Sequence, residues 1–509
     1  MRLLLKSALI SLLSGGIFAL HAFGPAVSSL KGVGDSRLDS ALVRTARGLI
    51  RHNIDPYADG LVHRPHSEEP GDAVSEGQAY GMIVALYTDD QTTFNRIWDG
   101  AENKMWNDGA KLYDWRVGAE GGIIGTGMAT DADQDIALML LFADSLVAKK
   151  KWKAHTGPKG ANYKQRALSI IQTIWAGAVV DGKYLAPGAG WGGKDFVNPS
   201  YFSPANYKIF AKVDPGHNWK GVIDQCYATI SASPGASKGL IPDWMTPSGS
   251  YFDGSLGYNP FRQGRSMYKD GIRVHWRMAM DWLWFGETRA KKWLDAAAAF
   301  IGTPDKANFY TMDGLVLPVT DTFTLGDGQK RSRREHSELT VGMWGCAAFA
   351  NLGPEKAKPW SDALVAFAPE GADTWGLPAD MNIPDRTGSM PNEAYFEQYL
   401  AWFGGAIMSG RFSNIWEDIA NNLPEVTGVG VRPGNQAGVS QPLQWWGNRV
   451  FGRLEPGQGI RWMNLQGKTL GLSRADAEGR VLWTPPAHHR GLLAALIGGS
   501  RTASLVLRP

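Results

Sequence analysis

The chain has 509 residues, of which 52 are Lys or Arg and 49 are Asp or Glu. That length accommodates one large domain and a smaller one, and the near-balance of charge argues against a nucleic-acid partner, which would favour a clustered basic surface. The 21 Trp and 62 Gly residues stand out. Flat indole faces suit either a Trp-rich core or the apolar faces of sugar rings.

The first residues predict an export signal. Arg2 and Lys6 form a short basic start, an apolar run follows over residues 12–20, and Ala22 or Ala26 offers a small residue for cleavage. Because the run is short and interrupted by Gly, it does not predict a membrane span. We expect residues 1–26 to be a signal peptide, and the protein to be secreted or periplasmic without stable membrane insertion.

Residues 36–410 show helical periodicity broken by loops rich in Gly, Pro and Asn. No apolar run alternates with these helices as the strands of a parallel sheet would. The pattern predicts an all-α fold, an (α/α)6 barrel of six hairpins whose inner helices open their N-termini on one face. Twelve helix starts are expected, near Ser36, Ser75, Gln91, Thr130, Asn162, Pro204, Asn218, Asp270, Glu287, Ser337, Pro354 and Asn392.

The composition changes beyond Phe412. Residues 426–444 are rich in Gly, Val, Pro and Gln, and the residues after them alternate short apolar runs with turn residues, as a small β module would. We expect a barrel domain over 27–411, a linker over 412–444 and a small, β-rich C-terminal module over 445–509. The module has three alternative roles, which are polysaccharide binding, export and packing on the barrel. Packing on the barrel is favoured.

Cys226 and Cys346 are the only cysteines of the chain. Each lies in an apolar, helical stretch, which favours two buried free thiols. Export would permit a disulfide between them, but the sequence does not show whether the two side chains come within reach.

Three acidic residues begin predicted helices, and Glu76 is the first. Ser75, with Gln78 three positions later, forms a capping-box pattern that places Glu76 in the first turn of a helix. Taken alone, such an acidic residue would do no more than complement the helix dipole.

Asp131 is the second, and it follows Thr130, a favourable N-cap residue. Because Asp133 and Asp135 come next, a calcium-binding loop is a competing interpretation. That loop requires a Gly at its sixth position and a distant Glu, whereas Ile136 stands there and the helix has already begun. We therefore expect neither a metal nor a cofactor.

Asp270 is the third, and it opens a helix with Arg273 and Arg277 on its face at i+3 and i+7. An Arg one turn away orients a carboxylate and keeps it ionised. A surface ion pair is the alternative, but the apolar, Trp-rich sequence that follows argues against a solvated face.

The three carboxylates start the second, fourth and eighth predicted helices, which belong to one ring and open on one face. Glycoside hydrolysis needs two such groups, one protonated to assist the leaving oxygen and one ionised. A helix N-terminus favours the ionised form. Glu76 must therefore be kept protonated by burial and by a neighbouring anion, for which Asp131 is the candidate.

In this order the three segments resemble glycoside hydrolase family 8, whose members are endo-acting β-1,4-glucanases, xylanases and chitosanases. The resemblance covers about residues 36–410, and residues 198–202 and 239–244 share in it. It implies the (α/α)6 barrel, with Glu76 as general acid, Asp131 binding and distorting the sugar at the cleavage point, and Asp270 as base. Members with an Asp at this last position act with inversion, by direct attack of water, whereas the chitosan-cutting branch usually lacks an acid there.

Aromatic residues complete the expected cleft. Trp115 and Trp191 lie in loops that would flank it and resemble the family's sugar-stacking positions. Tyr395 and Tyr399 lie one turn apart on the last helix, where either hydroxyl would hold the attacking water or both rings would simply pack. The residues assigned to substrate binding are Trp115, Trp191, Arg273, Tyr395 and Tyr399.

The sequence thus predicts a monomeric, endo-acting and inverting hydrolase of β-1,4-linked polysaccharide, with cellulose as the favoured substrate. Xylan, mixed-linkage glucan and chitosan are alternatives within the same family. A polysaccharide lyase would need a Tyr, His or Lys base in place of paired carboxylates, and a non-catalytic polysaccharide-binding protein would not need all three acidic residues. Whether the role is degradative or biosynthetic is left open by the sequence.

Overall fold

The computed structural model describes residues 30–65, 67, 69–252, 265–317, 336–376 and 395–416 with their side chains. Within 322–332 and 441–506 it describes the strands by their backbone. The chain divides into two units, Met1–Val426 and Thr427–Pro509. The predicted signal peptide, residues 1–26, lies outside the described residues.

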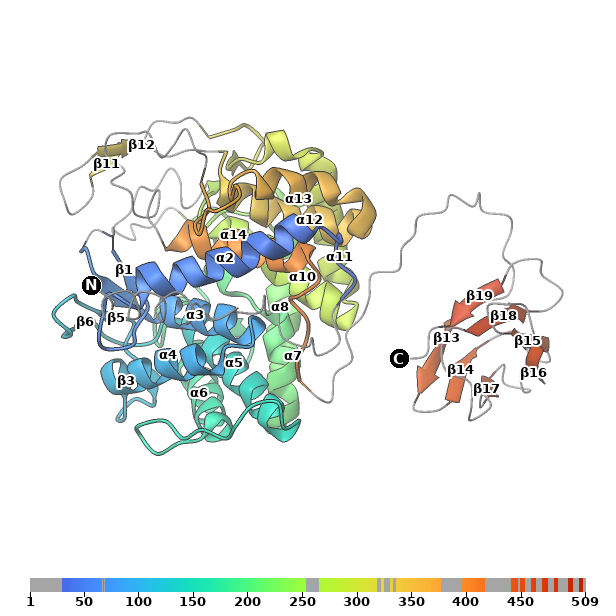
Figure 1. Ribbon diagram of the computed structural model, residues 1–509, viewed down its shortest axis with the longest axis horizontal. Helices are drawn as coiled ribbons and strands as arrows, with labels where there is room; N and C mark the ends of the chain where they lie inside the picture. The colour runs from blue at the N-terminus through green and yellow to red at the C-terminus, as the bar shows by residue number, and fades with distance from the viewer. Residues whose placement is uncertain are drawn as a thin grey trace, which may run out of the picture. The chain divides into compact units, whose positions relative to one another are not determined.

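Figure 1 labels the helices of the first unit, and six of them are buried along most of their length. Each packs against the next in the series and the last packs against the first, so the six close a ring. None of the helices in the described residues combines the length and apolarity needed to cross a membrane. The inner helices are α3 (Ser75–Tyr87), α5 (Thr130–Ala148), α7 (Pro204–Val213), α10 (Val274–Phe285), α12 (Glu338–Lys356) and α14 (Phe396–Met408).

The other six helices bury one face and expose the other, as surface helices do. They contact the inner ring in order: α4 on α3, α6 on α5, α8 on α7, α11 on α10, α13 on α12 and α2 on α14. Outer and inner helices alternate along the chain, which confirms the predicted (α/α)6 barrel. The outer helices are α2 (Ser36–Asn53), α4 (Gln91–Lys104), α6 (Tyr163–Ala178), α8 (Trp219–Ser231), α11 (Thr288–Ile301) and α13 (Lys358–Val365).

A four-stranded antiparallel sheet leads into α3. Its strand order is β1 (His63–Arg64), β2 (Asp72–Val74), β5 (Arg116–Val117) and β6 (Ile123–Gly125). β2 runs directly into Ser75, whose N–H donates to the carbonyl of Trp115 at 2.9 Å. The sheet therefore ties the loop that carries Trp115 to the N-terminus of α3.

Short hairpins and single 3₁₀ turns fill the other connections in the described residues. The hairpins pair β3 (Trp106–Asn107) with β4 (Leu112–Tyr113), β7 (Val179–Val180) with β8 (Tyr184–Leu185) and β11 (Thr322–Thr324) with β12 (Lys330–Ser332). A further antiparallel pair joins β9 (Ser266–Met267), before α10, to β10 (Tyr310–Thr311), after α11. The turns are η1 (Pro199–Tyr201), η2 (Ala236–Lys238), η3 (Gly271–Arg273) and η4 (Pro304–Lys306).

The capping box predicted at the start of α3 is wrong. Val74 is the N-cap residue and makes no side-chain hydrogen bond. Gln78 instead accepts from the N–H of Val62 at 2.8 Å and donates to the carbonyl of Val62 at 3.0 Å. The side chain that was expected to close the cap therefore anchors the chain ahead of β1 against the inner ring.

The segment after α14 belongs to the barrel. Phe412 and Ile415 are buried. Tyr87, at the end of α3, donates to the carbonyl of Ser413 at 2.7 Å, and Trp284, near the end of α10, donates to that of Phe412 at 2.9 Å. The predicted start of the linker at residue 412 is therefore too early, because these residues close the ring where the inner helices end.

The second unit contains seven strands in its described residues, in two antiparallel sheets. The expectation of a β-rich C-terminal module is confirmed, although its first strand begins at Gln441 and not after residue 444. One sheet has the order β13 (Gln441–Trp446), β14 (Arg449–Arg453) and β17 (Arg480–Trp483), and the other β16 (Thr469–Arg474), β15 (Gly459–Met463), β18 (Leu493–Ile497) and β19 (Ala503–Val506).

The two cysteines are buried free thiols, Cys226 on α8 and Cys346 on α12. The sequence favours this state over a disulfide between the two residues. Burial raises the pKa of both thiols, which makes them unreactive core residues.

Candidate active site

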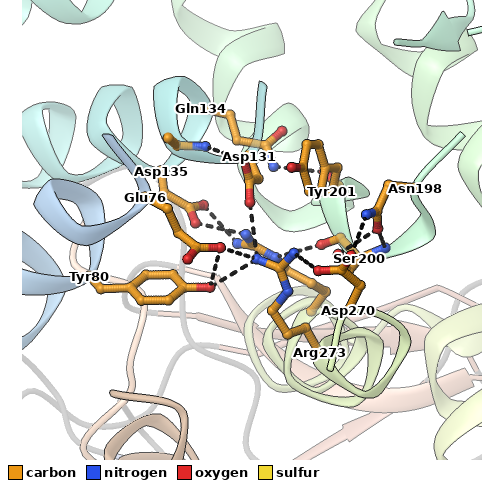
Figure 2. A network of polar contacts seen from close by, with 12 residues as sticks. Glu76, Tyr80, Asp131, Gln134, Asp135, Asn198, Ser200, Tyr201, Asp270 and Arg273 are labelled. Carbon is orange, nitrogen blue, oxygen red and sulfur yellow. Dashed lines mark hydrogen bonds and ion pairs between the residues drawn. The ribbon is translucent and has the colours of Figure 1, made fainter. Parts of the chain in front are cut away.

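One guanidinium gathers the three carboxylates that begin inner helices, as Figure 2 shows. Nη1 of Arg273 donates to Oε2 of Glu76 at 2.6 Å and to Oδ2 of Asp131 at 3.0 Å. Nη2 donates to Oδ1 of Asp270 at 2.7 Å. The convergence expected from counting helices is thus present, and its centre is an Arg whose side chain is only 2% exposed.

Glu76 lies in the first turn of α3 and is held by three donors. Besides Arg273, the hydroxyl of Tyr395 donates to Oε1 at 2.6 Å and that of Tyr80 to Oε2 at 3.3 Å. Burial raises the pKa of both phenols well above its usual value, so both hydroxyls keep their protons. These contacts fix the carboxyl group of Glu76 in one orientation.

Asp131 lies in the first turn of α5 and is the most deeply buried of the three. Burial raises its pKa to about 7; Arg273 opposes that shift, and the negative charge of Glu76 adds to it. The sequence predicts an ionised Asp131 beside Glu76. Burial instead leaves Asp131 partly protonated near neutral pH.

Asp270 stands just before η3, which continues into α10. Its Oδ1 binds Arg273, and its Oδ2 accepts from Nδ2 of Asn198 at 3.0 Å. The side chain is 30% exposed, against 19% for Glu76 and 3% for Asp131. Asp270 is therefore oriented through both oxygens and has the best access to water.

A second ion pair lies one turn deeper in the ring. Arg277 binds Asp135 through both Nη atoms, at 2.7 Å each, and its Nε donates to the carbonyl of Ser200 at 3.3 Å. Bidentate pairs of this kind fix geometry as well as charge. The pair holds α5 against α10, and with them Asp131 against Arg273.

Trp115 lies next to the N-terminus of α3 with its side chain 37% exposed. Its ring packs on the backbone of Gly125, where an added Cβ would lie 2.5 Å from the indole. Because the carbonyl of Trp115 accepts the N–H of Ser75, the loop that exposes this indole is fixed at the N-terminus of the helix that carries Glu76.

Trp191 is 46% exposed and packs edge-to-face on Phe196 and Trp244, with ring centroids 5.1 and 5.5 Å away. Its loop is tied to the start of α5, because the hydroxyl of Thr130 donates to the carbonyl of Ala186 at 2.8 Å. Thr130 is the first residue of α5, not its N-cap as predicted. The structure thus places both predicted Trp residues in loops fixed to the helices that carry Glu76 and Asp131.

The other three residues assigned to substrate binding are buried among protein groups. Arg273 binds the carboxylates and is a positioning residue. Tyr395 is 3% exposed and its hydroxyl lies on Glu76, not beside Asp270 where an attacking water was expected. Tyr399 is 1% exposed and packs on the ring of Tyr395, which agrees with the alternative of simple packing.

Sequence reasoning missed the neutral partners of the cluster, Tyr80 and Asn198. Tyr80 lies one turn after Glu76 on the same face, a spacing that offered a signal. Asn198 lies in a segment noted only for its resemblance to the family. In the part of the chain that the structure describes, no group of three or more His, Cys, Asp or Glu residues has the arrangement of metal ligands.

The family model described as glycosyl hydrolases family 8 matches residues 57–329, which is more than half of the chain and includes Glu76, Asp131 and Asp270. The chain belongs to glycosyl hydrolase family 8. Endoglucanase 2 of Ruminiclostridium josui is 38% identical over 260 residues, 50% of this chain and 53% of that protein. Endoglucanase A of Acetivibrio thermocellus is 36% identical over 254 residues, 48% and 49% of the two chains. This family 8 chain therefore spans about half the length of the curated relatives it matches.

Solved structures share the barrel. A β-1,3-1,4-glucanase from Paenibacillus sp. X4, in its apo form, has a TM-score of 0.58 at 22% identity, over 76% of this chain and 96% of that one. Rex8A from Paenibacillus barcinonensis, complexed with xylose, has a TM-score of 0.57 at 20% identity, over 75% and 97%. At these identities the likeness establishes the fold of this family 8 protein.

Proposed function

We propose that this family 8 protein is an endo-acting glycoside hydrolase that cleaves β-1,4-glucan, cellulose in particular. The observation that carries the proposal is the convergence of Glu76, Asp131 and Asp270 on Arg273, between loops that expose Trp115 and Trp191. Relatives named endoglucanases at 35–38% identity support the glucan and the endo mode. Xylan is the second candidate, because a relative 26% identical is named an exo-oligoxylanase.

Glu76 is the general acid in this proposal. Arg273 and Tyr80 both donate to Oε2, which leaves Oε1 as the oxygen that carries the proton. Tyr395 contacts Oε1 at 2.6 Å, and a phenol hydroxyl is able to accept a hydrogen bond as well as donate one. Glu76 then gives this proton to the glycosidic oxygen as the bond to the leaving sugar breaks.

Asp270 is the base that takes a proton from the attacking water. Its contact with Arg273 orients the carboxyl group, and its exposure gives a water molecule access. Glu76 and Asp270 bind different nitrogens of one guanidinium and do not bind each other. We therefore propose inversion, which requires room for water between base and sugar.

Asp131 binds the sugar at the cleavage point in this mechanism. Its pKa of about 7 lets the carboxyl group donate or accept a hydrogen bond at neutral pH. A sugar hydroxyl does both, so Asp131 is suited to follow a ring that changes shape on the way to the transition state.

We further propose that the protein is secreted or periplasmic, because residues 1–26 resemble a signal peptide. We also propose that it acts as a monomer.

The proposal is tested by replacing Glu76 with Gln and Asp270 with Asn. Each change is expected to lower turnover on soluble β-glucan by about 10²–10⁴-fold, the usual contribution of an acid or base, with the circular dichroism spectrum unchanged. Asp90→Asn is the matched control, because Asp90 caps outer helix α4 by accepting the N–H of Thr93 and Asn caps equally well. That variant should keep full activity.

Reducing-sugar release separates the competing classes. A non-catalytic binding protein would release none from any polymer, and a lyase would form unsaturated, ultraviolet-absorbing products. A panel of cellulose, mixed-linkage glucan, xylan and chitosan then identifies the substrate. Retention of more than about a tenth of wild-type turnover by either acid or base variant would contradict the role given to that residue.

A further inference from the structure

The turn that presents Asp270 is built around another buried carboxyl group, that of Asp243. Asp243 is 3% exposed. Its Oδ1 accepts the N–H of Tyr268 and the N–H of Gly271, each at 2.8 Å. The backbone of Asp270 also donates to this carboxyl group. Asp243 therefore occupies the concave side of the turn formed by residues 268–271.

The turn and the segment that carries Asp243 are in close contact. A Cβ at Gly271 would lie 2.5 Å from the carbonyl oxygen of Ile241 and 3.1 Å from Oδ1 of Asp243. The N–H of Asp243 donates to the carbonyl of Ser266 at 3.1 Å, just before the turn. The turn is thus held at both ends, and it cannot shift without losing these hydrogen bonds.

Asp243 is suited to this place as a neutral acid. Burial raises its pKa well above the usual range and the charge of Asp270 adds to this, while the backbone donors and Arg273 oppose it. A neutral carboxyl group still offers Oδ1 as an acceptor but adds no second negative charge beside Asp270. Asn has the same acceptor atom and no charge, so it is the conservative replacement.

We propose that Asp243 is a positioning residue for Asp270. By binding the N–H groups of Tyr268 and Gly271, it sets the direction in which the carboxylate of Asp270 points. Because Oδ1 of Asp243 binds backbone N–H groups on the inside of the turn, Asp243 acts through Asp270 and not on the substrate. This inference rests on the proposed role of Asp270 as the base.

The test compares Asp243→Ala with Asp243→Asn in the full chain. The Ala variant removes the acceptor, and misplacing a reacting group by about 1 Å costs about 10²-fold in rate, so kcat should fall by about that factor with little change in KM. The Asn variant keeps the acceptor and should recover most of the lost kcat. Should the Ala variant fail to fold, Gly271→Ala displaces the same turn through its Cβ and should lower kcat in the same way.

Asp214→Ala is the matched control. Asp214 is also a buried Asp, 8% exposed, and it accepts from Nε1 of Trp219 at 2.9 Å in the connection from the end of α7 to α8. Its replacement should lower the midpoint of thermal unfolding but leave kcat per folded molecule unchanged.

Two outcomes would overturn the inference: wild-type kcat in Asp243→Ala, or an Asp243→Asn variant as inactive as the Ala variant. Asp270→Asn, measured alongside, separates the role of Asp270 as base from the positioning role of Asp243. If Asp270→Asn retains turnover, the proposed base is wrong. If it is inactive while Asp243→Ala is not, only the positioning role fails.

Discussion

Asp131 experiences two opposed effects, burial and the charge of Arg273, and burial is the larger. Its oxygen shares Nη1 of Arg273 with Glu76, at 3.0 and 2.6 Å respectively. One guanidinium faces three carboxylates, so it cannot stabilise the ionised form of all of them. The carboxyl group of Asp131 therefore releases its proton near neutral pH, so the stability of the folded protein depends on pH in this range.

Wild-type protein should therefore lose stability, relative to Asp131→Asn, as pH rises from about 4 to about 7. The pKa of Asp131 rises on folding from 3.8 to about 7, so in this interval the folded state binds more protons than the unfolded state. Each pH unit then costs about 1.4 kcal/mol at most. The two proteins should be closest in stability near pH 4, where Asp131 is protonated.

Urea unfolding at several pH values measures this difference. Asp133, whose pKa burial raises to about 8, titrates in both proteins, and in the wild type the charge of Asp131 raises that pKa further. This coupling also lowers the stability of the wild type relative to the variant as pH rises, so it acts in the expected direction. A wild-type protein that gains stability over the variant as pH rises would mean that pairing with Arg273 outweighs burial.

The acidic residues of the site were predictable from the sequence, and their partners were not. Glu76 and Asp131 stand at helix starts that local patterns reveal, and Asp270 has Arg273 one turn away. The bonds from Tyr395 to Glu76 and from Asn198 to Asp270 join residues 319 and 72 positions apart. No local pattern encodes such contacts, because they depend on how the ring closes.

At the scale of elements, the residues after α14 close the end of the barrel. Phe412 stacks on Tyr87, with ring centroids 4.5 Å apart, and lies 6.2 Å from the ring of Trp284. Lys149, just after α5, donates to the carbonyl of Ile415 at 2.7 Å. The C-terminal ends of three inner helices thus contact one short segment.

Phe412→Ala should lower the free energy of unfolding by about 3–5 kcal/mol, the usual cost of removing a buried aromatic side chain. The matched control is Leu352→Ala on α12, a residue that is 39% exposed, for which a change within about 0.5 kcal/mol is expected. Denaturant unfolding gives both values. Equal effects of the two changes would show that the segment is not part of the core.

The positions of the helices were predictable because inner and outer helices differ in their apolar pattern. The residues at which the helices begin and end were less predictable. The start predicted at Pro354 coincides with a break inside α12, where Gly353 has φ 76° and ψ 171°, whereas α13 itself begins at Lys358. The break at residue 412 was inferred from composition. Composition does not show that Phe412 and Ile415 pack against the ends of helices that are far away in the sequence.

At the scale of the whole molecule, every residue assigned to the site lies in the first unit, Met1–Val426. A chain that ends at Val426 should therefore hydrolyse soluble β-glucan with the turnover of the full chain. A chain that ends at residue 411 is the comparison. It lacks Phe412 and Ile415 and should be less stable, in agreement with the Phe412→Ala variant.

Thermal unfolding and reducing-sugar release on both shortened chains check this expectation. Loss of activity in a folded chain that ends at Val426 would mean that the C-terminal β unit contributes to the substrate site.

The central claim is that Glu76 and Asp270 act as acid and base on opposite sides of the sugar at the cleavage point. Carboxyl groups about 6.5–9.5 Å apart leave room for water and lead to inversion, whereas a separation of about 5–5.5 Å leads to retention. Proton NMR of a fresh digest of soluble β-glucan tests the claim most directly. The account predicts that the α-anomer forms first, and an initial β-anomer would contradict both the mechanism and the role of Asp270.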